Sequence, residues 1–271
     1  MRIFLFGLII LGGGYLYFEE PNAPPPIDAE FRMEEREAPE RTGPLTEKNR
    51  DDLLVPYSGS GEYSVPQDTV AAATTHQLNG RQWHSYRPRN RLGMLPVVIL
   101  FHGAGRDGLS MIDMWRDTAD KNGLLLVALD GRQQNWPAEN VAPTILHDIL
   151  SEAADLARID EDRIYLFGHS NGARYVQSLI NLTKGPWRAA AVHAGYGDPA
   201  TAIVPADPKP IRFYLGTRDH IFDTETARIV ARALSDKGHP TDLHLIPNHT
   251  HWFYEAGPLI AADAWAWFAR L

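Results

Sequence analysis

The clearest pattern in the chain is a series of short apolar runs separated by longer segments with helical periodicity. The apolar runs span residues 96–101, 124–129, 163–167, 189–193, 211–215 and 243–246, and the helical segments span 110–121, 144–158, 172–183, 224–237 and 258–270. Strands that are apolar without alternation are buried on both faces. Their interleaving with amphipathic helices predicts an α/β fold, in which a mostly parallel central sheet carries helices on both faces.

A β-hairpin is expected ahead of these elements. Residues 74–78 and 81–86 flank Asn79-Gly80, a pair that favours the type I′ turn because both residues tolerate positive φ. We therefore predict an N-terminal antiparallel hairpin, and a single domain over residues 63–271.

The first 18 residues have a different composition. Residues 3–18 carry no charge and are bounded by Arg2 and by Glu19-Glu20. As a helix, this stretch would extend about 24 Å. The absence of a small-x-small cleavage site favours an uncleaved signal anchor over a signal peptide, and Arg2 would stay on the cytoplasmic side. We expect an exported domain that is membrane-tethered on the extracytoplasmic, periplasmic side, or secreted if the segment is cleaved.

Most of the net charge lies in the next segment. Residues 19–62 hold twelve acidic and five basic residues and seven of the twenty prolines, in a chain of net charge −8. Such a segment buries too little apolar surface to offset its ordering entropy, so we predict a disordered linker. The acidic balance disfavours nucleic acid as a partner. The chain has no cysteine, which excludes disulfides, a thiol nucleophile and thiolate metal ligands.

The strongest chemical signal is Gly168-His169-Ser170-Asn171-Gly172, between the apolar run 163–167 and a helical segment. This is the G-x-S-x-G pattern in a strand–turn–helix context. The flanking glycines would admit the strained backbone that exposes the serine hydroxyl. The alternative is a helix-capping serine in a glycine-rich turn. We predict that Ser170 is a nucleophile.

A second glycine-rich loop follows the run 96–101. In His102-Gly103-Ala104-Gly105, backbone amides could approach a substrate closely. Attack on a carbonyl creates an oxyanion that requires two N–H donors, and we assign these to the backbone amides of Ala104 and Asn171. His102 comes too early in the chain to be the base. It is expected to brace this loop or to contact the substrate.

A serine nucleophile needs a histidine base and a carboxylate to orient it. Asp219 follows the run 211–215, whereas Asp223 is more consistent with the N-cap of the next helix. Both His249 and His251 follow the run 243–246, and we favour His251. The order Ser170, Asp219, His251 is that of α/β-hydrolases.

Three aromatic or histidine-rich features have weaker signals. Trp136 and Trp252 are candidate substrate-binding residues because each is expected in a loop on the same side of the sheet as the candidate triad. His244, His249 and His251 could ligate a metal, but no carboxylate is spaced to complete the site. We therefore predict no metal and no cofactor.

These motifs resemble those of the polyhydroxybutyrate depolymerase and feruloyl esterase branch of the α/β-hydrolases. The similarity rests on residues 102–105, 164–173 and 216–219, with further likeness at 148–149 and 159–163, and covers most of residues 70–271. The resemblance implies an α/β-hydrolase fold and serine-esterase chemistry on small or polymeric carboxylic esters. It leaves the natural ester and the oligomeric state open. The alternatives are a peptidase with the same triad and a catalytically silent hydrolase fold that acts as a tethered binding module.

Overall fold

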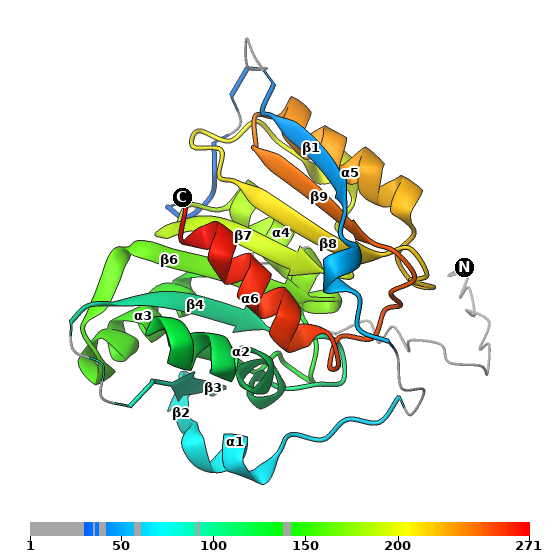
Figure 1. The fold of residues 1–271 in the computed structure, drawn as a ribbon. Helices are drawn as coiled ribbons and strands as arrows, with labels where there is room; N and C mark the ends of the chain where they lie inside the picture. The colour runs from blue at the N-terminus through cyan, green and yellow to red at the C-terminus, as the bar shows by residue number, and fades with distance from the viewer. Residues whose placement is uncertain are drawn as a thin grey trace, which may run out of the picture.

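The structure, a computed structural model, describes residues 30–34, 36–37, 42–56, 61–89, 91, 93–137 and 142–271. Within these residues, nine strands form one twisted sheet in the order β1-β9-β8-β7-β6-β4-β5-β3-β2 (Figure 1). The strands are β1 (Leu45–Asn49), β2 (Thr74–Leu78), β3 (Arg81–Tyr86), β4 (Leu95–Phe101), β5 (Leu125–Leu129), β6 (Ile159–His169), β7 (Trp187–His193), β8 (Ile211–Gly216) and β9 (Thr241–Ile246). In this sheet order, neighbouring strands from β1 across to β5 are parallel to each other. At the other end of the sheet, β3 is antiparallel to both β5 and β2.

Helices cover both faces of this sheet. The described helices are α1 (Gln67–Ala72), which packs against α2, then α2 (Gly108–Asn122), α3 (Pro143–Leu156), α4 (Asn171–Leu182), α5 (Thr224–Asp236) and α6 (Gly257–Phe268), with 3-10 turns at Asp51–Leu53 and Pro199–Thr201. Apolar residues of α2 and α6 pack with one face of the sheet, and those of α3, α4 and α5 pack with the other. Strand β4 shows the cause, because Val97 and Ile99 join one cluster whereas Val98 and Leu100 join the other. The predicted α/β class is confirmed.

The predicted hairpin is also present. Asn79 and Gly80 have φ angles of 51° and 73°, the left-handed conformation that a type I′ turn requires. Strand β3 then pairs with β5 and joins the hairpin to the parallel sheet.

The structure corrects the boundary between linker and domain. Strand β1 lies inside the segment predicted to be disordered, and it pairs in parallel with β9 at the edge of the sheet. Met33, also in that segment, is buried, and its amide donates to the carbonyl of Leu182 at 2.8 Å. The charged composition misled the prediction because an edge strand exposes most of its side chains and needs little apolar surface.

The predicted anchor, residues 1–18, lies outside the described residues. Among the helices that are described, none combines the length and the apolar character needed to cross a membrane.

The parallel arrangement brings the candidate residues to one edge. Strands β4, β6, β8 and β9 lead at their carboxyl ends into the loops that carry Gly103, Ser170, Asp219 and His251. In a sheet of this kind, ligands bind outside the carboxyl ends of the strands.

Candidate active site

Ser170 occupies a sharp turn between β6 and α4. Its φ and ψ are 53° and −116°, a strained backbone conformation that residues other than glycine rarely adopt. Such conformations are concentrated at functional sites. The turn requires glycine on both sides. A Cβ on Gly168 would lie 2.4 Å from the carbonyl oxygen of Gly172, and a Cβ on Gly172 would lie 2.3 Å from that of Phe101. The G-x-S-x-G spacing therefore has a steric cause.

Three side chains from separate loops form a continuous hydrogen-bonded series. His251 Nε2 lies 2.9 Å from Ser170 Oγ, and His251 Nδ1 lies 2.9 Å from Asp219 Oδ2. The Asp219 side chain is fully buried. Its second oxygen accepts from the amides of Ile221 and Phe222 at 2.8 and 2.9 Å. These bonds fix the carboxylate, which in turn orients the imidazole.

The structure also separates the residues that the sequence left as alternatives. His251 contacts the serine, whereas His249 points to a different histidine, His193. Asp223 caps helix α5, since its Oδ1 accepts from the amide of Thr226 at 2.8 Å. Local spacing could not decide between the histidines, because their side-chain directions depend on the loop after β9.

Two backbone amides of the loop after β4 are hydrogen-bonded within the protein. The amide of Gly105 donates to the carbonyl of Gln134 at 3.0 Å, and that of Arg106 donates to the carbonyl of Gly103 at 3.2 Å. Within the described part of the chain, the amides of Ala104 and Asn171 have no hydrogen-bond acceptor. Both amides therefore have the bonding capacity predicted for oxyanion donors.

His102 supports this loop from below. Its ring is fully buried, its Nε2 accepts from the amide of Gly131 at 2.9 Å, and its Nδ1 therefore donates to the carbonyl of Gly103 at 2.8 Å. Burial lowers the pKa of this imidazole, which keeps it neutral. The geometry therefore supports the bracing role of His102. The alternative prediction, that His102 contacts the substrate, is wrong because its ring is fully buried.

Trp136 is likewise a supporting residue. Its side chain is 3 % exposed, its indole N–H donates to the carbonyl of His102 at 2.9 Å, and its ring packs against Phe101 and Tyr175. The Asn171 side chain holds it in place by accepting from the Trp136 amide at 2.6 Å and donating to its carbonyl at 3.1 Å. This burial corrects the prediction that Trp136 binds substrate. The Asn171 clamp had no signal in the sequence.

Trp252 remains a candidate for substrate contact because it is only half-buried. It belongs to an aromatic group around the Arg106 guanidinium, whose carbon lies 5.6 Å from the ring centroid of Tyr63, 5.7 Å from that of Trp252 and 4.9 Å from that of Tyr254. On another side of His251, the Phe222 ring is stacked at 5.8 Å between centroids. The candidate base, His251, therefore lies among aromatic rings.

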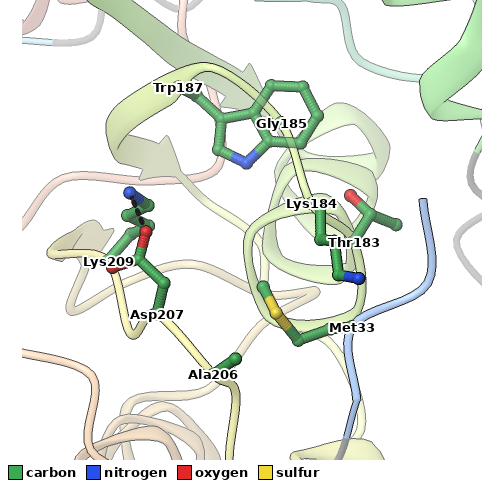
Figure 2. Close-up of a pocket in the computed structure, with 8 residues that line it drawn as sticks. All are labelled: Met33, Thr183, Lys184, Gly185, Trp187, Ala206, Asp207 and Lys209. Carbon is green, nitrogen blue, oxygen red and sulfur yellow. Dashed lines mark ion pairs between the residues drawn. The ribbon is translucent and has the colours of Figure 1, made fainter. Parts of the chain in front are cut away.

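A pocket of about 190 Å³ lies at the amino ends of the strands, opposite the ends that carry the candidate triad (Figure 2). It is bounded by Thr183 at the end of α4, by Trp187 at the start of β7 and by the ion pair of Asp207 with Lys209 just before β8. These positions are at the amino ends of strands, so this pocket is separate from the triad. In the described residues, no three His, Cys, Asp or Glu side chains are grouped so that they could hold a metal ion.

The sheet order, the strained serine between strand and helix, and the position of the histidine define an α/β-hydrolase. The chain belongs to the dienelactone hydrolase family, whose model matches residues 127–269. The predicted superfamily is thereby confirmed. No curated protein matches the chain.

Solved structures with the same fold include esterases and a depolymerase. A thermostable esterase is 20% identical with a TM-score of 0.59, and the match covers 73% of this chain but only 62% of that one. The poly(3-hydroxybutyrate) depolymerase LpqC from Bordetella parapertussis is 19% identical with a TM-score of 0.53, covering 73% and 93% of the two chains. The carboxylesterase from Mesorhizobium loti is 23% identical with a TM-score of 0.55, covering 71% and 98%. At these identities the likeness shows the shared fold.

Proposed function

We propose that the protein is a serine hydrolase of carboxylic esters that acts through an acyl-enzyme. The observation that carries the proposal is the position of His251. Its Nε2 lies 2.9 Å from Ser170 Oγ, and its Nδ1 lies 2.9 Å from Asp219 Oδ2. A histidine so placed can remove the serine proton while the carboxylate holds its tautomer. Membership of a hydrolase family supports the assignment.

In the first step, Ser170 Oγ attacks the ester carbonyl and its proton passes to His251 Nε2. The negative oxygen that develops is held by the amides of Ala104 and Asn171, which lie on the two loops beside the serine. His251 then donates the proton to the departing alcohol. Because Asp219 accepts from Nδ1–H, it stabilises the transient imidazolium.

In the second step, water replaces the alcohol. His251 removes a proton from the water as it attacks the acyl carbonyl, and returns that proton to Ser170 Oγ as the acid leaves. The same two amides hold the second oxyanion. These steps use only side chains and amides of this chain.

The test is hydrolysis of p-nitrophenyl butyrate by the full chain, compared with Ser170→Ala. We expect the variant to lose nearly all activity and to escape labelling by a fluorophosphonate, which reacts with activated serines. Ser110→Ala is the matched control, since Ser110 hydrogen-bonds to the backbone in the first turn of α2. Equal turnover by wild type and Ser170→Ala would refute the proposal. Preference for peptides over esters would instead indicate a peptidase.

For the location of the protein, we propose export with retention at the membrane through residues 1–18. The support is the uncharged run 3–18 between Arg2 and Glu19-Glu20, a charge distribution typical of signal anchors. Membrane fractionation followed by intact-mass measurement is the test. A mass that lacks the first residues would replace the anchor with a cleaved signal peptide.

A further inference from the structure

Three buried histidines form a chain of hydrogen bonds behind the nucleophile. His169 ends β6 and immediately precedes Ser170, His193 ends β7, and His249 lies in the loop after β9. His169 Nδ1 is 3.0 Å from His193 Nδ1, and His193 Nε2 is 3.0 Å from His249 Nε2. His193 is fully buried, and the two end residues are each 5 % exposed. The esterase mechanism uses none of these rings.

All three imidazoles are neutral near pH 7. Burial holds the pKa values of His169 and His193 well below 6.5 and lowers that of His249 to about 4. Each ring therefore carries one N–H and one lone pair.

Neutrality restricts the protons to two arrangements. Each contact needs one donor and one acceptor, so His193 must donate through one nitrogen and accept through the other. If His193 donates from Nε2, it accepts from His169 Nδ1–H, and His249 carries its proton on Nδ1. If His193 donates from Nδ1, then His169 and His249 both carry the proton on Nε2. The tautomers of all three rings thus change together, and the buried chain has two states.

One end of the chain lies beside the nucleophile. A Cβ placed on Gly103 would be 2.9 Å from His169 Cδ2 and 3.3 Å from both His169 Nε2 and Ser170 Cβ, so the Cδ2–Nε2 edge of the His169 ring lies against the same glycine as the serine. The His169 ring is also 5.4 Å from the ring of His251, between centroids. Whether His169 Nε2 carries a proton or a lone pair therefore changes the local field at the catalytic histidine.

The charged groups around the chain favour one state. His251, once protonated, and Arg106 are the cations whose charges act on His169, and since Nδ1 of His169 faces His193, they favour a lone pair at its other nitrogen, Nε2. Asp219 and Glu255 are the anions whose charges act on His249, against that of His251, and since Nε2 of His249 faces His193, these anions favour a proton at its Nδ1. Both ends select the arrangement in which His193 donates from Nε2. In a buried, low-dielectric region such oriented dipoles act strongly on a nearby charge.

We propose that His169, His193 and His249 form a tautomer-coupled positioning element that stabilises the imidazolium form of His251 during acyl transfer. His169 turns its Nε2 lone pair toward the site, and the two rings behind it hold that orientation by keeping Nδ1 of His169 protonated. The inference rests on the proposed esterase function. Because no proton enters or leaves the chain, the three residues assist the reaction electrostatically and exchange nothing with the substrate.

The direct test reads the tautomers in the intact wild-type protein. In a 15N-histidine-labelled sample near pH 7.5, we expect His169 and His249 to be protonated on Nδ1 and His193 on Nε2, as judged by imidazole nitrogen shifts. This measurement requires no variant to fold. A proton on Nε2 of His169, or rapid averaging of the three rings between tautomers, would overturn the proposal.

The kinetic test removes the far end of the chain. His249→Phe leaves His193 without its acceptor, and we expect kcat for p-nitrophenyl butyrate to fall on the order of tenfold while KM stays unchanged. His249→Gln should restore most of kcat, since its side-chain oxygen can accept from His193 Nε2–H. His239→Phe is the control, because His239 is also buried but bonds to the Lys209 carbonyl and Asn181, away from the triad.

The outcomes separate the two proposals. If wild type hydrolyses the ester and His249→Phe, correctly folded, keeps its kcat, the histidine chain has no role while the esterase assignment stands. If His249→Gln fails to restore kcat lost in His249→Phe, the loss is due to packing and the proposal is wrong. An absence of ester hydrolysis by wild type would refute the proposed function itself.

Discussion

His244 makes a specific prediction about stability in acid. The ring is 3 % exposed in β9, and its Nδ1 accepts from the Arg50 guanidinium at 3.0 Å, so the proton of the neutral ring is on Nε2. Protonation of Nδ1 would replace that hydrogen bond with a cation facing Arg50 and Arg212. Burial and these two arginines lower the pKa of His244 to about 4, although Asp263 and Asp242 act in the opposite direction.

The magnitude follows from the two protonation equilibria. The unfolded chain binds this proton with a pKa near 6.5 and the folded chain with a pKa of about 4, so the unfolded state binds it more tightly. The stability that comes from a neutral His244 is thus fully present above pH 6.5 and is lost as the pH falls toward 4. At about pH 5, which is about 1.5 units below the unfolded pKa, the loss is about 2 kcal/mol.

The comparison with His244→Asn isolates this effect. The Asn side-chain oxygen can still accept from Arg50 but does not titrate, and all other ionisable groups are shared. From urea unfolding at about pH 7.5 and about pH 5, we expect wild type to lose about 2 kcal/mol more than the variant. The absolute stability of the variant does not affect the result, because the free energy of unfolding of each protein at about pH 5 is compared with its own value at about pH 7.5. If both proteins lose the same free energy between the two pH values, the reasoning about His244 is wrong.

Three further predictions concern the site and the domain boundary. Asp219→Asn should lower kcat for p-nitrophenyl butyrate by a factor on the order of 10³ to 10⁴, since the amide cannot select the correct tautomer of His251; unchanged kcat would contradict the assigned role. Gly172→Ala should lower stability by about 1–3 kcal/mol, measured by thermal unfolding, because its Cβ would lie 2.3 Å from the Phe101 carbonyl oxygen. A chain that starts at residue 42 should fold more stably than one that starts at residue 51, because the latter lacks β1 and Arg50, which bonds to Asp263 at 2.6 Å. Equal melting temperatures for the two chains would show that β1 adds nothing.

The parts of the fold that follow from local pattern could be predicted. Apolar runs such as 96–101 are short enough to favour buried strands over buried helices, and Asn79-Gly80 favours a tight turn, so the α/β class and the hairpin follow from neighbouring residues. The G-x-S-x-G turn is equally local, since the two glycines and the serine meet within five residues. Edge strand β1 is the opposite case. Its residues are mostly polar, and only pairing with β9, far along the chain, makes them a strand.

The candidate triad is partly local and partly tertiary. The sequence supplied Ser170 and the two acidic and two histidine alternatives, because each follows a buried strand. The selection of His251 over His249 depends on how the loop after β9 turns toward β6, and this direction is set by packing. Trp136 and His102 also depend on packing. The sequence places both residues near the site, but only the tertiary structure shows that they are buried.

The central strands, the longer helices, the turn that carries Ser170 and the candidate side chains for acyl transfer could all be read from the amino-acid sequence, because these depend on residues close together in the chain. Which imidazole reaches Ser170, and which one bonds to His193 in the buried series, depends on how distant parts of the chain pack together. The reason is geometric: β9, β8, β7 and β6 follow one another in the sheet, so the loops after β6 and β9 bring together Ser170 and His251, which are 81 residues apart in the chain. Contacts between such loops are set by strand order and register, which short-range patterns do not encode.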